Sequence, residues 1–236
     1  MRERDGAPGG WRTATDAGFS LVEMVVALGI FSLLMVMTSI GLLRAMSGIR
    51  TVDSVTAQQI ASSTTAESLG RYLRYMALPK SLTTGAGLNN SGVISASTKS
   101  LRFYSYSGSG QRHDIPYLVD ISVQTLANGA QQVVVTTTPP NTVSNGQWTW
   151  GTGTTASTRR LLAVPAGAGT PLALGLTKCE RASDCHGTRV PVSLGTTPAA
   201  VALSDGWVND TVTITVGPSG NPDYVVTQTI ALVNQI

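Results

Sequence analysis

The sequence has few charged residues and lacks the motifs of a catalytic or nucleic-acid-binding protein. Charged residues make up 12% of the 236 residues, and the net charge is +3. This charge is dispersed, whereas a nucleic-acid-binding domain concentrates Lys and Arg in a patch or stripe. His113 and Asp114 are adjacent, but no nucleophile motif, phosphate-binding glycine loop or paired carboxylate accompanies them. We therefore expect neither an enzyme nor a cofactor, and binding of DNA or of a surface has no support.

Proline is also absent over a long N-terminal stretch, from Pro8 to Pro79. Because proline breaks a helix and disfavours helix at the preceding residue, a helix can continue from Phe19 to about Leu78. Three glycines within it, Gly29, Gly41 and Gly48, each weaken the helix by about 1 kcal/mol relative to alanine. They favour close packing between helices or local melting of the helix.

The first part of this helix is apolar on all sides. The run from Gly18 to Leu43 contains a single charged residue, Glu23. About 20 apolar residues suffice to span a bilayer as a helix, so residues 19–43 are predicted to form a transmembrane helix. A charge at the bilayer centre costs about 2–3 kcal/mol, and less near an end. Glu23 therefore needs a cation, and the new α-amino group formed by a cut before Phe19 is one candidate.

From Arg44 onwards the pattern becomes amphipathic, and residues 44–78 are predicted to continue the helix. Apolar residues recur at about helical spacing, with charged and polar residues between them. This half of the helix is expected to lay an apolar stripe on a head domain formed by residues 79–236. The apolar positions of the stripe are Ile49, Val52, Val55 or Thr56, Ile60, Leu69, Leu73 and Met76.

Residues 1–18 are polar and precede the apolar run, unlike a secretory signal peptide, whose cleavage site follows its apolar region. Arg2, Arg4 and Arg12 favour a cytoplasmic N-terminus in a single-pass protein of the cytoplasmic membrane, although Arg44 and Arg50 on the far side weaken this. An uncleaved signal anchor with the same topology is the alternative to a cleaved leader.

The segment Gly18-Phe19-Ser20-Leu21-Val22-Glu23 resembles the signal of type IV prepilins and pseudopilins. In that family a short hydrophilic leader ends in glycine, a hydrophobic residue follows, and a glutamate stands five residues after the cut. The resemblance implies cleavage between Gly18 and Phe19 by a prepilin peptidase and N-methylation of Phe19. It also implies that Glu23 pairs with the Phe19 amine of a neighbouring subunit, and that the partners are major and minor pilins and the pilus assembly machinery in the membrane.

The head domain is predicted to be β-rich and mainly antiparallel, since β-branched and aromatic runs alternate with turn residues. The segment Ala127-Asn128-Gly129-Ala130 is a strong hairpin signal, and residues 217–222 form a second turn. The predicted strands are Val93–Ala96, Leu101–Tyr106, Tyr117–Leu126, Gln132–Thr138, Arg160–Val164, Trp207–Val216 and Tyr224–Val233. A long helix followed by such strands matches an α+β, pilin-like fold.

The C-terminal hairpin carries a more particular resemblance. Residues 210–235 alternate Thr with apolar residues and end in Ala231-Leu232-Val233-Asn234. This resembles the closing hairpin of W-type minor pilins and of J-type pseudopilins of type II secretion systems. The resemblance implies a minor pilin of a type IV pilus, which becomes extracellular after assembly. A type II secretion pseudopilin and a signal-anchored surface binding protein are the alternatives.

Cys179 and Cys185 are the only cysteines. A head facing an oxidising compartment favours a disulfide between them, which would contribute about 2–3 kcal/mol. Free thiols are an alternative. A metal site would add Asp184 and His186, but this set lacks the ligand spacing of a zinc site.

Two further groups of residues have a functional and a structural interpretation. The first could bind calcium through loop oxygens, but it fits no EF-hand, and acidic residues at turns are common. Its members are Asp205, Asn209, Asp210 and Asp223. The second could form an adhesive surface, although packing on the sheet is the more common role of such aromatic residues. Its members are Tyr104, Tyr106, Trp148 and Trp150.

Overall fold

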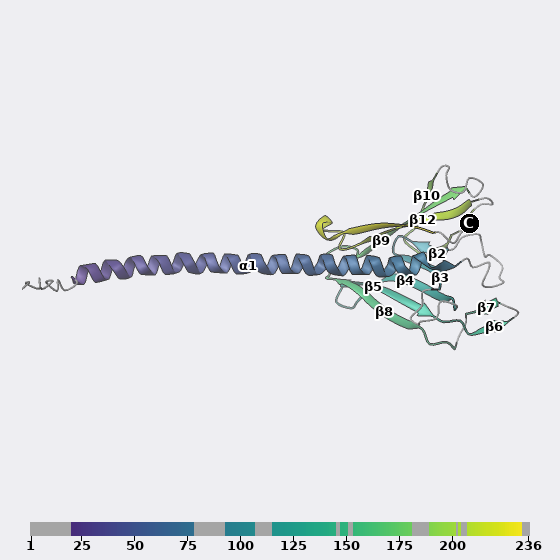
Figure 1. Ribbon diagram of the computed structural model, residues 1–236, viewed down its shortest axis with the longest axis horizontal. Helices are drawn as coiled ribbons and strands as arrows, with labels where there is room; N and C mark the ends of the chain where they lie inside the picture. The colour runs from purple at the N-terminus through teal and green to yellow at the C-terminus, as the bar shows by residue number, and fades with distance from the viewer. Residues whose placement is uncertain are drawn as a thin grey trace, which may run out of the picture. The chain divides into compact units, whose positions relative to one another are not determined.

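The computed structural model describes residues 20–77, 93–106, 115–144, 147–150, 153–180, 189–201, 203 and 207–232. The chain divides into two units, Met1–Val52 and Asp53–Ile236. Helix α1, Leu21–Arg74, begins in the first unit and ends in the second. The predicted α+β, pilin-like fold is confirmed: one long helix is followed by antiparallel sheets (Figure 1).

Helix α1 ends at Arg74, before the predicted end near Leu78. The next residues leave the helix because they pair with a strand. Met76–Ala77 forms strand β1, antiparallel to β3, Ser100–Ser105, with Met76 opposite Ser105. The Ser105 hydroxyl also donates to the Tyr72 carbonyl at 2.7 Å, so the last turn of the helix is tied to the sheet.

The described part of the second unit contains three antiparallel sheets. The largest has the strand order β11-β2-β3-β4-β5-β8, with β1 also paired to β3; the second has the order β10-β9-β12-β13; and β6 pairs with β7. Their remaining strands are β2 Val93–Ser97, β4 Tyr117–Thr125, β5 Gln131–Thr138, β6 Thr142–Ser144, β7 Gln147–Thr149, β8 Ser157–Val164, β9 Leu172–Glu180, β10 Val190–Val192, β11 Ala199–Ala200, β12 Trp207–Val216 and β13 Val226–Ala231.

Both predicted hairpin turns are confirmed. Between β4 and β5, Gly129 has a φ of 77°, a left-handed conformation that favours glycine, and the Leu126 amide donates to the Ala130 carbonyl at 2.8 Å. After β12, Gly217 has a φ of 132°. A Cβ atom there would lie 2.3 Å from the Tyr224 carbonyl oxygen, so only glycine fits. A 3-10 helix, Pro222–Tyr224, then leads into β13.

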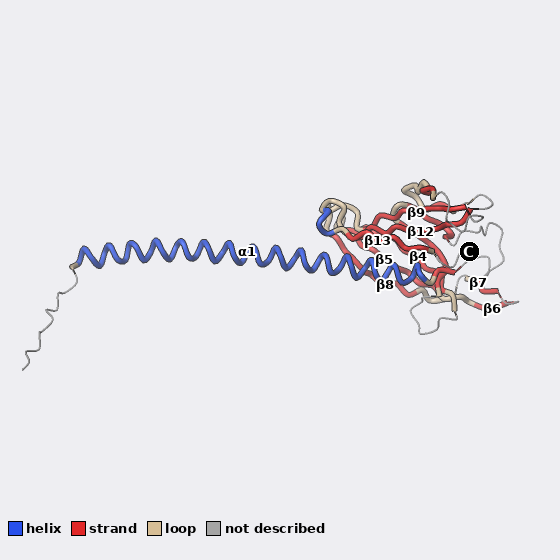
Figure 2. Tube along the Cα trace, turned by 45° about the horizontal axis from the view of Figure 1, so that its top comes forward, coloured by secondary structure: helices blue, strands red, loops and turns tan. Residues whose placement is uncertain are grey.

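The core of the second unit lies where the end of α1 meets both larger sheets. Leu69 and Leu73 of the helix join Phe103 and Ile121 of the first sheet and Ile214 of the second in a single hydrophobic cluster. Figure 2 shows strands of both sheets alongside this part of the helix. The approach is close at Gly70, where a Cβ atom would lie 3.2 Å from Cδ1 of Ile230. The head therefore builds its core around the last turns of α1.

The predicted apolar stripe of the helix is only partly correct. Leu69, Leu73 and Met76 are buried, but Ile49, Val52 and Ile60 are exposed. The buried face also contains small residues: Ser62, Thr65, Ala66 and Gly70. Because the sheets lie close to the helix there, small side chains fit at positions where the stripe pattern would favour large apolar ones.

Candidate functional site

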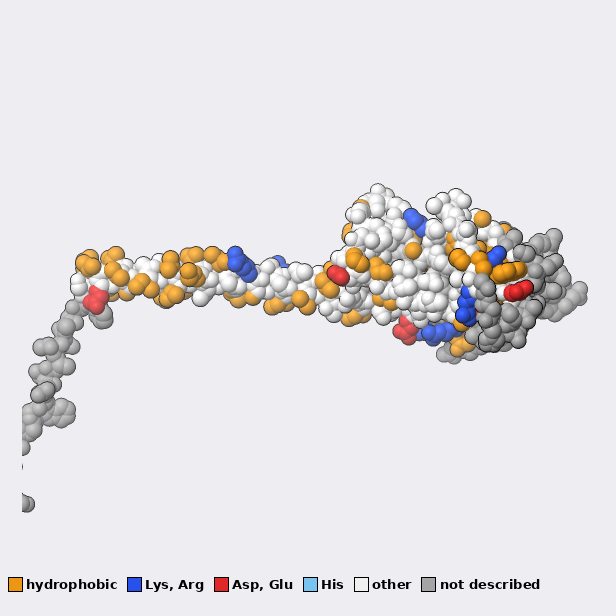
Figure 3. All heavy atoms as spheres, turned by 90° about the horizontal axis from the view of Figure 1, so that it is seen from above, with side chains coloured by type: hydrophobic (Ala, Val, Ile, Leu, Met, Phe, Trp, Pro, Cys, Tyr) orange, Lys and Arg blue, Asp and Glu red, His pale blue; other side chains and the backbone are white. Residues whose placement is uncertain are grey.

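The functional candidate in the first unit is the exposed apolar surface of α1. Leu21 is 80% exposed, and Leu33 and Leu43 are 60% and 67% exposed. The described residues contain one helix long and apolar enough to cross a membrane, and the apolar stretch of this helix is not buried against the protein. Figure 3 shows hydrophobic side chains along this helix before the first arginine. So much apolar surface requires a covering, either lipid or other apolar helices.

Three hydroxyl side chains of this segment donate hydrogen bonds within the helix. The Ser32 hydroxyl donates to the Gly29 carbonyl at 2.8 Å, and the Ser39 hydroxyl donates to the Met35 carbonyl at 2.7 Å. Thr38 donates to the Leu34 carbonyl at 2.9 Å. A hydroxyl bonded in this way needs no water, so these residues are compatible with a hydrocarbon environment.

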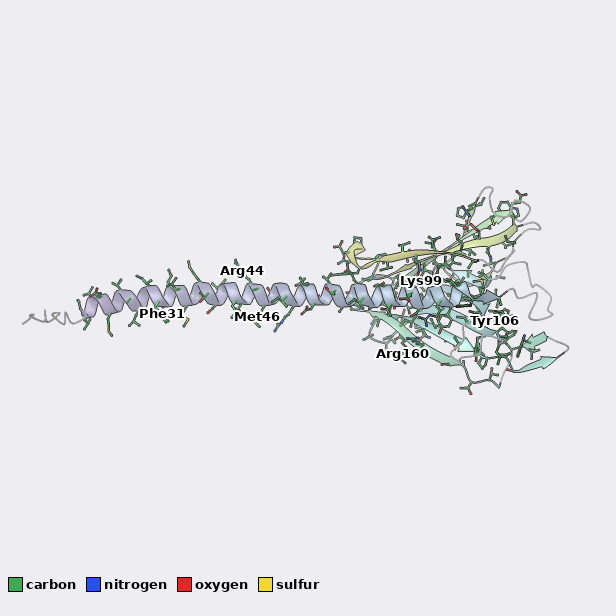
Figure 4. All side chains as sticks on the ribbon, viewed as in Figure 1. Phe31, Arg44, Met46, Lys99, Tyr106 and Arg160 are labelled. Atoms are coloured by element: carbon green, nitrogen blue, oxygen red, sulfur yellow. The ribbon has the colours of Figure 1, made fainter. Side chains whose placement is uncertain are left out.

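The apolar surface has the length of a membrane span. Residues 21–43 cover about 34 Å at about 1.5 Å per residue, compared with about 30 Å for the hydrocarbon core. Arg44 and Arg50 follow as the first basic residues of the helix. Figure 4 shows Arg44 on one side of α1 and both Phe31 and Met46 on the other. The sequence thus changes from apolar on all sides to partly charged one bilayer thickness after the helix begins.

Glu23 lies in the first turn of α1. The Met24 amide donates to the Ser20 carbonyl at 3.1 Å, so the helix is closed from Ser20 onwards. A carboxylate here is favoured by the positive end of the helix dipole, but within the described chain Glu23 has no ion pair. Gly18 and Phe19 lie outside the described residues, so the predicted cleavage, the methylation and the pairing of Glu23 remain predictions.

The N-terminal segment has a match among known protein families. Residues 14–39 match the family model of the prokaryotic N-terminal methylation motif. The matched range contains Gly18, Phe19, Glu23 and most of the apolar run. The chain therefore carries a type IV pilin-like signal, which supports a pilin-like or pseudopilin protein and implies processing by a prepilin peptidase and assembly by pilus machinery. No curated protein and no solved structure matches the chain.

The predicted disulfide involves one described cysteine. Cys179 is fully buried on β9, next to Val208 of β12 in the sheet register. The described part of the chain contains no free cysteine. Cys185 lies outside the described residues, as do Asp184 and His186, so the pairing itself remains a prediction. His113 and Asp114 lie outside them too.

The residues weighed as calcium ligands do not form a cluster where the structure describes them. Asp210 lies near the open end of the β12–β13 hairpin and forms an ion pair with Arg189, while Asp223 lies at the turn end, in the 3-10 helix. Asn209 is buried, and Asp205 is outside the described residues. No group of three or more His, Cys, Asp or Glu residues able to hold a metal occurs in the described ranges.

The aromatic residues pack on the sheet, as the structural interpretation predicted. The rings of Tyr104 and Trp150 pack with centroids 4.3 Å apart and planes tilted by 34°, and Tyr106 and Trp148 join the same small cluster. The cluster is centred on Tyr104 and Leu118, on the opposite face of the sheet from Phe103 and Val119 in the main core. It forms a second, smaller hydrophobic region on the outer face of the first sheet.

Strand β9, which is central in the second sheet, was not predicted from the sequence. Leu172, Leu174 and Leu176 alternate with small residues, and all three leucines are buried. This period-two alternation was the available signal, but the interspersed Ala and Gly residues have low β-propensity and obscured it.

Proposed function

We propose that this protein is a minor pilin of a type IV pilus, a structural subunit without enzymatic activity. The methylation motif at residues 14–39 is the observation that carries the proposal. The exposed apolar helix and the β-rich head support it. The minor role is favoured by a head larger than that of a typical major pilin and by the resemblance of the C-terminal hairpin to W-type subunits.

The physical basis of assembly is an exchange of coverings for the apolar helix. Before assembly, the cytoplasmic membrane surrounds residues 19–43, with the N-terminus in the cytoplasm. After cleavage and assembly, the helices of neighbouring subunits cover the same surface in an extracellular fibre. Because lipid and neighbouring helices are both apolar, the transfer needs little exposure of this surface to water.

Glu23 favours the fibre over the membrane as the location of the helix. In the membrane its carboxylate lacks a partner from its own apolar run, which contains no Lys or Arg. In the fibre it pairs with the α-amino group of Phe19 on an adjacent subunit. Removing one partner of a buried ion pair costs about 3–5 kcal/mol, so a subunit without the carboxylate is expected to be excluded from the fibre.

The test compares Glu23→Ala with Glu67→Ala, which removes an exposed acid of α1 in the second unit. We expect Glu23→Ala to enter the membrane normally but to be absent from sheared, purified fibres, and Glu67→Ala to be present in both. Incorporation of Glu23→Ala at the level of the unmodified protein would contradict the proposed pairing.

Deletion of the protein distinguishes a pilus from a secretion system. Loss of surface pili, with secreted enzymes unaffected, is expected for a minor pilin. Loss of a secreted enzyme, with pili retained, would instead identify a type II secretion pseudopilin with the same signal and fold.

A further inference from the structure

A groove of about 510 Å³ lies on the outer face of the first sheet. On β3 and β4 the side chains of Leu101, Phe103, Val119 and Ile121 are buried in the core. Because successive residues of a strand point to opposite faces, Arg102 and Asp120 point outwards into the groove. Lys99 and Tyr106, labelled in Figure 4, flank the two ends of β3. The groove therefore lies on the opposite face of the sheet from the main hydrophobic core.

Sheet register places four polar side chains in one row across the groove. Ser95 of β2 is opposite Arg102 of β3, Arg102 is opposite Asp120 of β4, and Asp120 is opposite Thr136 of β5. With neighbouring strands about 4.8 Å apart, the row is about 14 Å long. All four residues line the groove. The row thus presents a guanidinium, a carboxylate and two hydroxyls in a fixed order.

The two charged groups in this row have unused hydrogen-bonding capacity. Across the described chain, neither the side chain of Arg102 nor that of Asp120 takes part in a hydrogen bond or an ion pair. A guanidinium has five N–H donors and a carboxylate has two acceptor oxygens. Asp120 is half-buried, and burial raises its pKa while the nearby Arg102 lowers it. Polar groups in partly desolvated positions are normally satisfied by a partner, so the row is suited to a ligand.

The composition of the groove selects the class of ligand. One positive and one negative charge side by side give no net attraction for a phosphate or a metal ion. Hydroxyls of Ser100 and Thr138 and the amide of Gln124 add both donors and acceptors, and Leu118 adds an apolar contact. A ligand with many hydroxyl groups and apolar C–H faces complements such a surface. The volume lies within the usual range for ligand sites, about 300–1,000 Å³.

We propose that this groove binds a neutral carbohydrate chain, with Arg102 and Asp120 bonded to its hydroxyl groups. The guanidinium donates to hydroxyl oxygens, and the carboxylate accepts from hydroxyl protons. Ser95 and Thr136 bind at the two ends of the row, and Leu118 contacts a C–H face of a sugar ring. This inference is independent of the minor pilin proposal, since it concerns only residues of the head.

The test uses the full chain in lipid nanodiscs, because many detergents carry sugar headgroups that would compete. The probes are neutral oligosaccharides built from glucose, galactose, mannose and N-acetylglucosamine, with acidic polysaccharides and short peptides as the other arms. We expect a neutral oligosaccharide to bind, and Arg102→Gln and Asp120→Asn each to weaken binding about tenfold or more. The matched controls Arg71→Gln and Glu67→Gln, exposed on α1, are expected to bind like the unmodified protein.

Three results would overturn the proposal: no binding of any neutral oligosaccharide, binding of acidic polysaccharides or peptides alone, or equal binding by the groove variants and their controls. Thermal unfolding of each variant separates loss of the site from loss of the fold. If either charge variant unfolds, Thr136→Val removes one hydroxyl of the row at nearly constant volume. Unchanged binding by a folded Thr136→Val variant would then count against the site.

Discussion

The two ends of helix α1 have opposite relations to their surroundings. Around Leu33 the helix exposes large apolar side chains, and Leu33 itself is 60% exposed. In the second unit, Leu69 and Leu73 are 0% and 1% exposed, and the buried face includes residues as small as Ser62 and Gly70. The first region can be covered by lipid or by other subunits, whereas the second region is covered by its own head. One continuous helix therefore combines an exposed apolar surface with a structural core element.

The strongest test of this comparison is a pair of identical substitutions at the two ends. Leu73→Ala removes a side chain from the core of the head and is expected to lower its free energy of unfolding by about 2–5 kcal/mol. Leu33→Ala removes the same atoms from an exposed position and is expected to leave that value unchanged. Urea unfolding of the full chain in nanodiscs, followed by near-ultraviolet circular dichroism, measures both. Equal effects of the two variants would contradict the contrast between a buried and an exposed end of α1.

Two glycine substitutions test the same difference between the two ends of α1. They compare the space available for a side chain at each end. At Gly70 an added Cβ atom would lie 3.1 Å from the Gln228 side chain and 3.2 Å from Ile230, whereas at Gly41 nothing lies within 4 Å. Gly70→Leu is expected to destabilise the head by about 1–3 kcal/mol through overpacking. Gly41→Leu should leave the melting temperature of the head unaltered, and a comparable drop in both variants would show that Gly70 is not tightly packed.

A smaller effect is expected at Asp120, and it depends on pH. Because burial raises the pKa of its carboxyl in the folded state, the ionised form is disfavoured there relative to the unfolded chain. The resulting destabilisation is present at neutral pH and disappears as the pH falls through the raised pKa and the fold takes up the proton. Asp120→Asn is therefore expected to be slightly more stable than the unmodified protein near neutral pH. Its advantage should vanish in acid, and a constant difference across the pH series would argue against this cause.

The smallest effect is expected at the ion pair between Arg189 and Asp210. The Arg189 side chain is 59% exposed and that of Asp210 10%. Because pairs with an exposed partner contribute about 0–1 kcal/mol, Arg189→Gln should change the unfolding free energy by less than 1 kcal/mol. A larger loss, measured by the same urea unfolding, would show that burial of Asp210 makes it depend on its partner.

The features that sequence predicts well are local ones. The spacing of Gly18, Phe19 and Glu23 lies within six consecutive residues, and the motif match covers it. The absence of proline between Pro8 and Pro79 predicted one long helix, and Asn128-Gly129 predicted a hairpin. In each case the physical cause acts between residues that are close in sequence, so no knowledge of the tertiary fold is needed.

The features that sequence missed depend on contacts between distant segments. Ile60 fits the helical stripe but is exposed, and Ser62 does not fit it but is buried, because the sheets determine which positions of α1 are covered. The groove requires the register of β3 against β4, which brings Arg102 opposite Asp120. Neither residue belongs to a motif, so no sequence pattern identifies the row.

We propose that the apolar helix begins at a processed N-terminus whose α-amino group takes part in assembly. The mass of the native N-terminal peptide, isolated from the membrane and fibre fractions of cells, tests it most directly. We predict a chain that starts at Phe19 with a methylated α-amino group in both fractions. A chain in the fibre fraction that still begins at Met1 and keeps residues 1–18 would contradict the account.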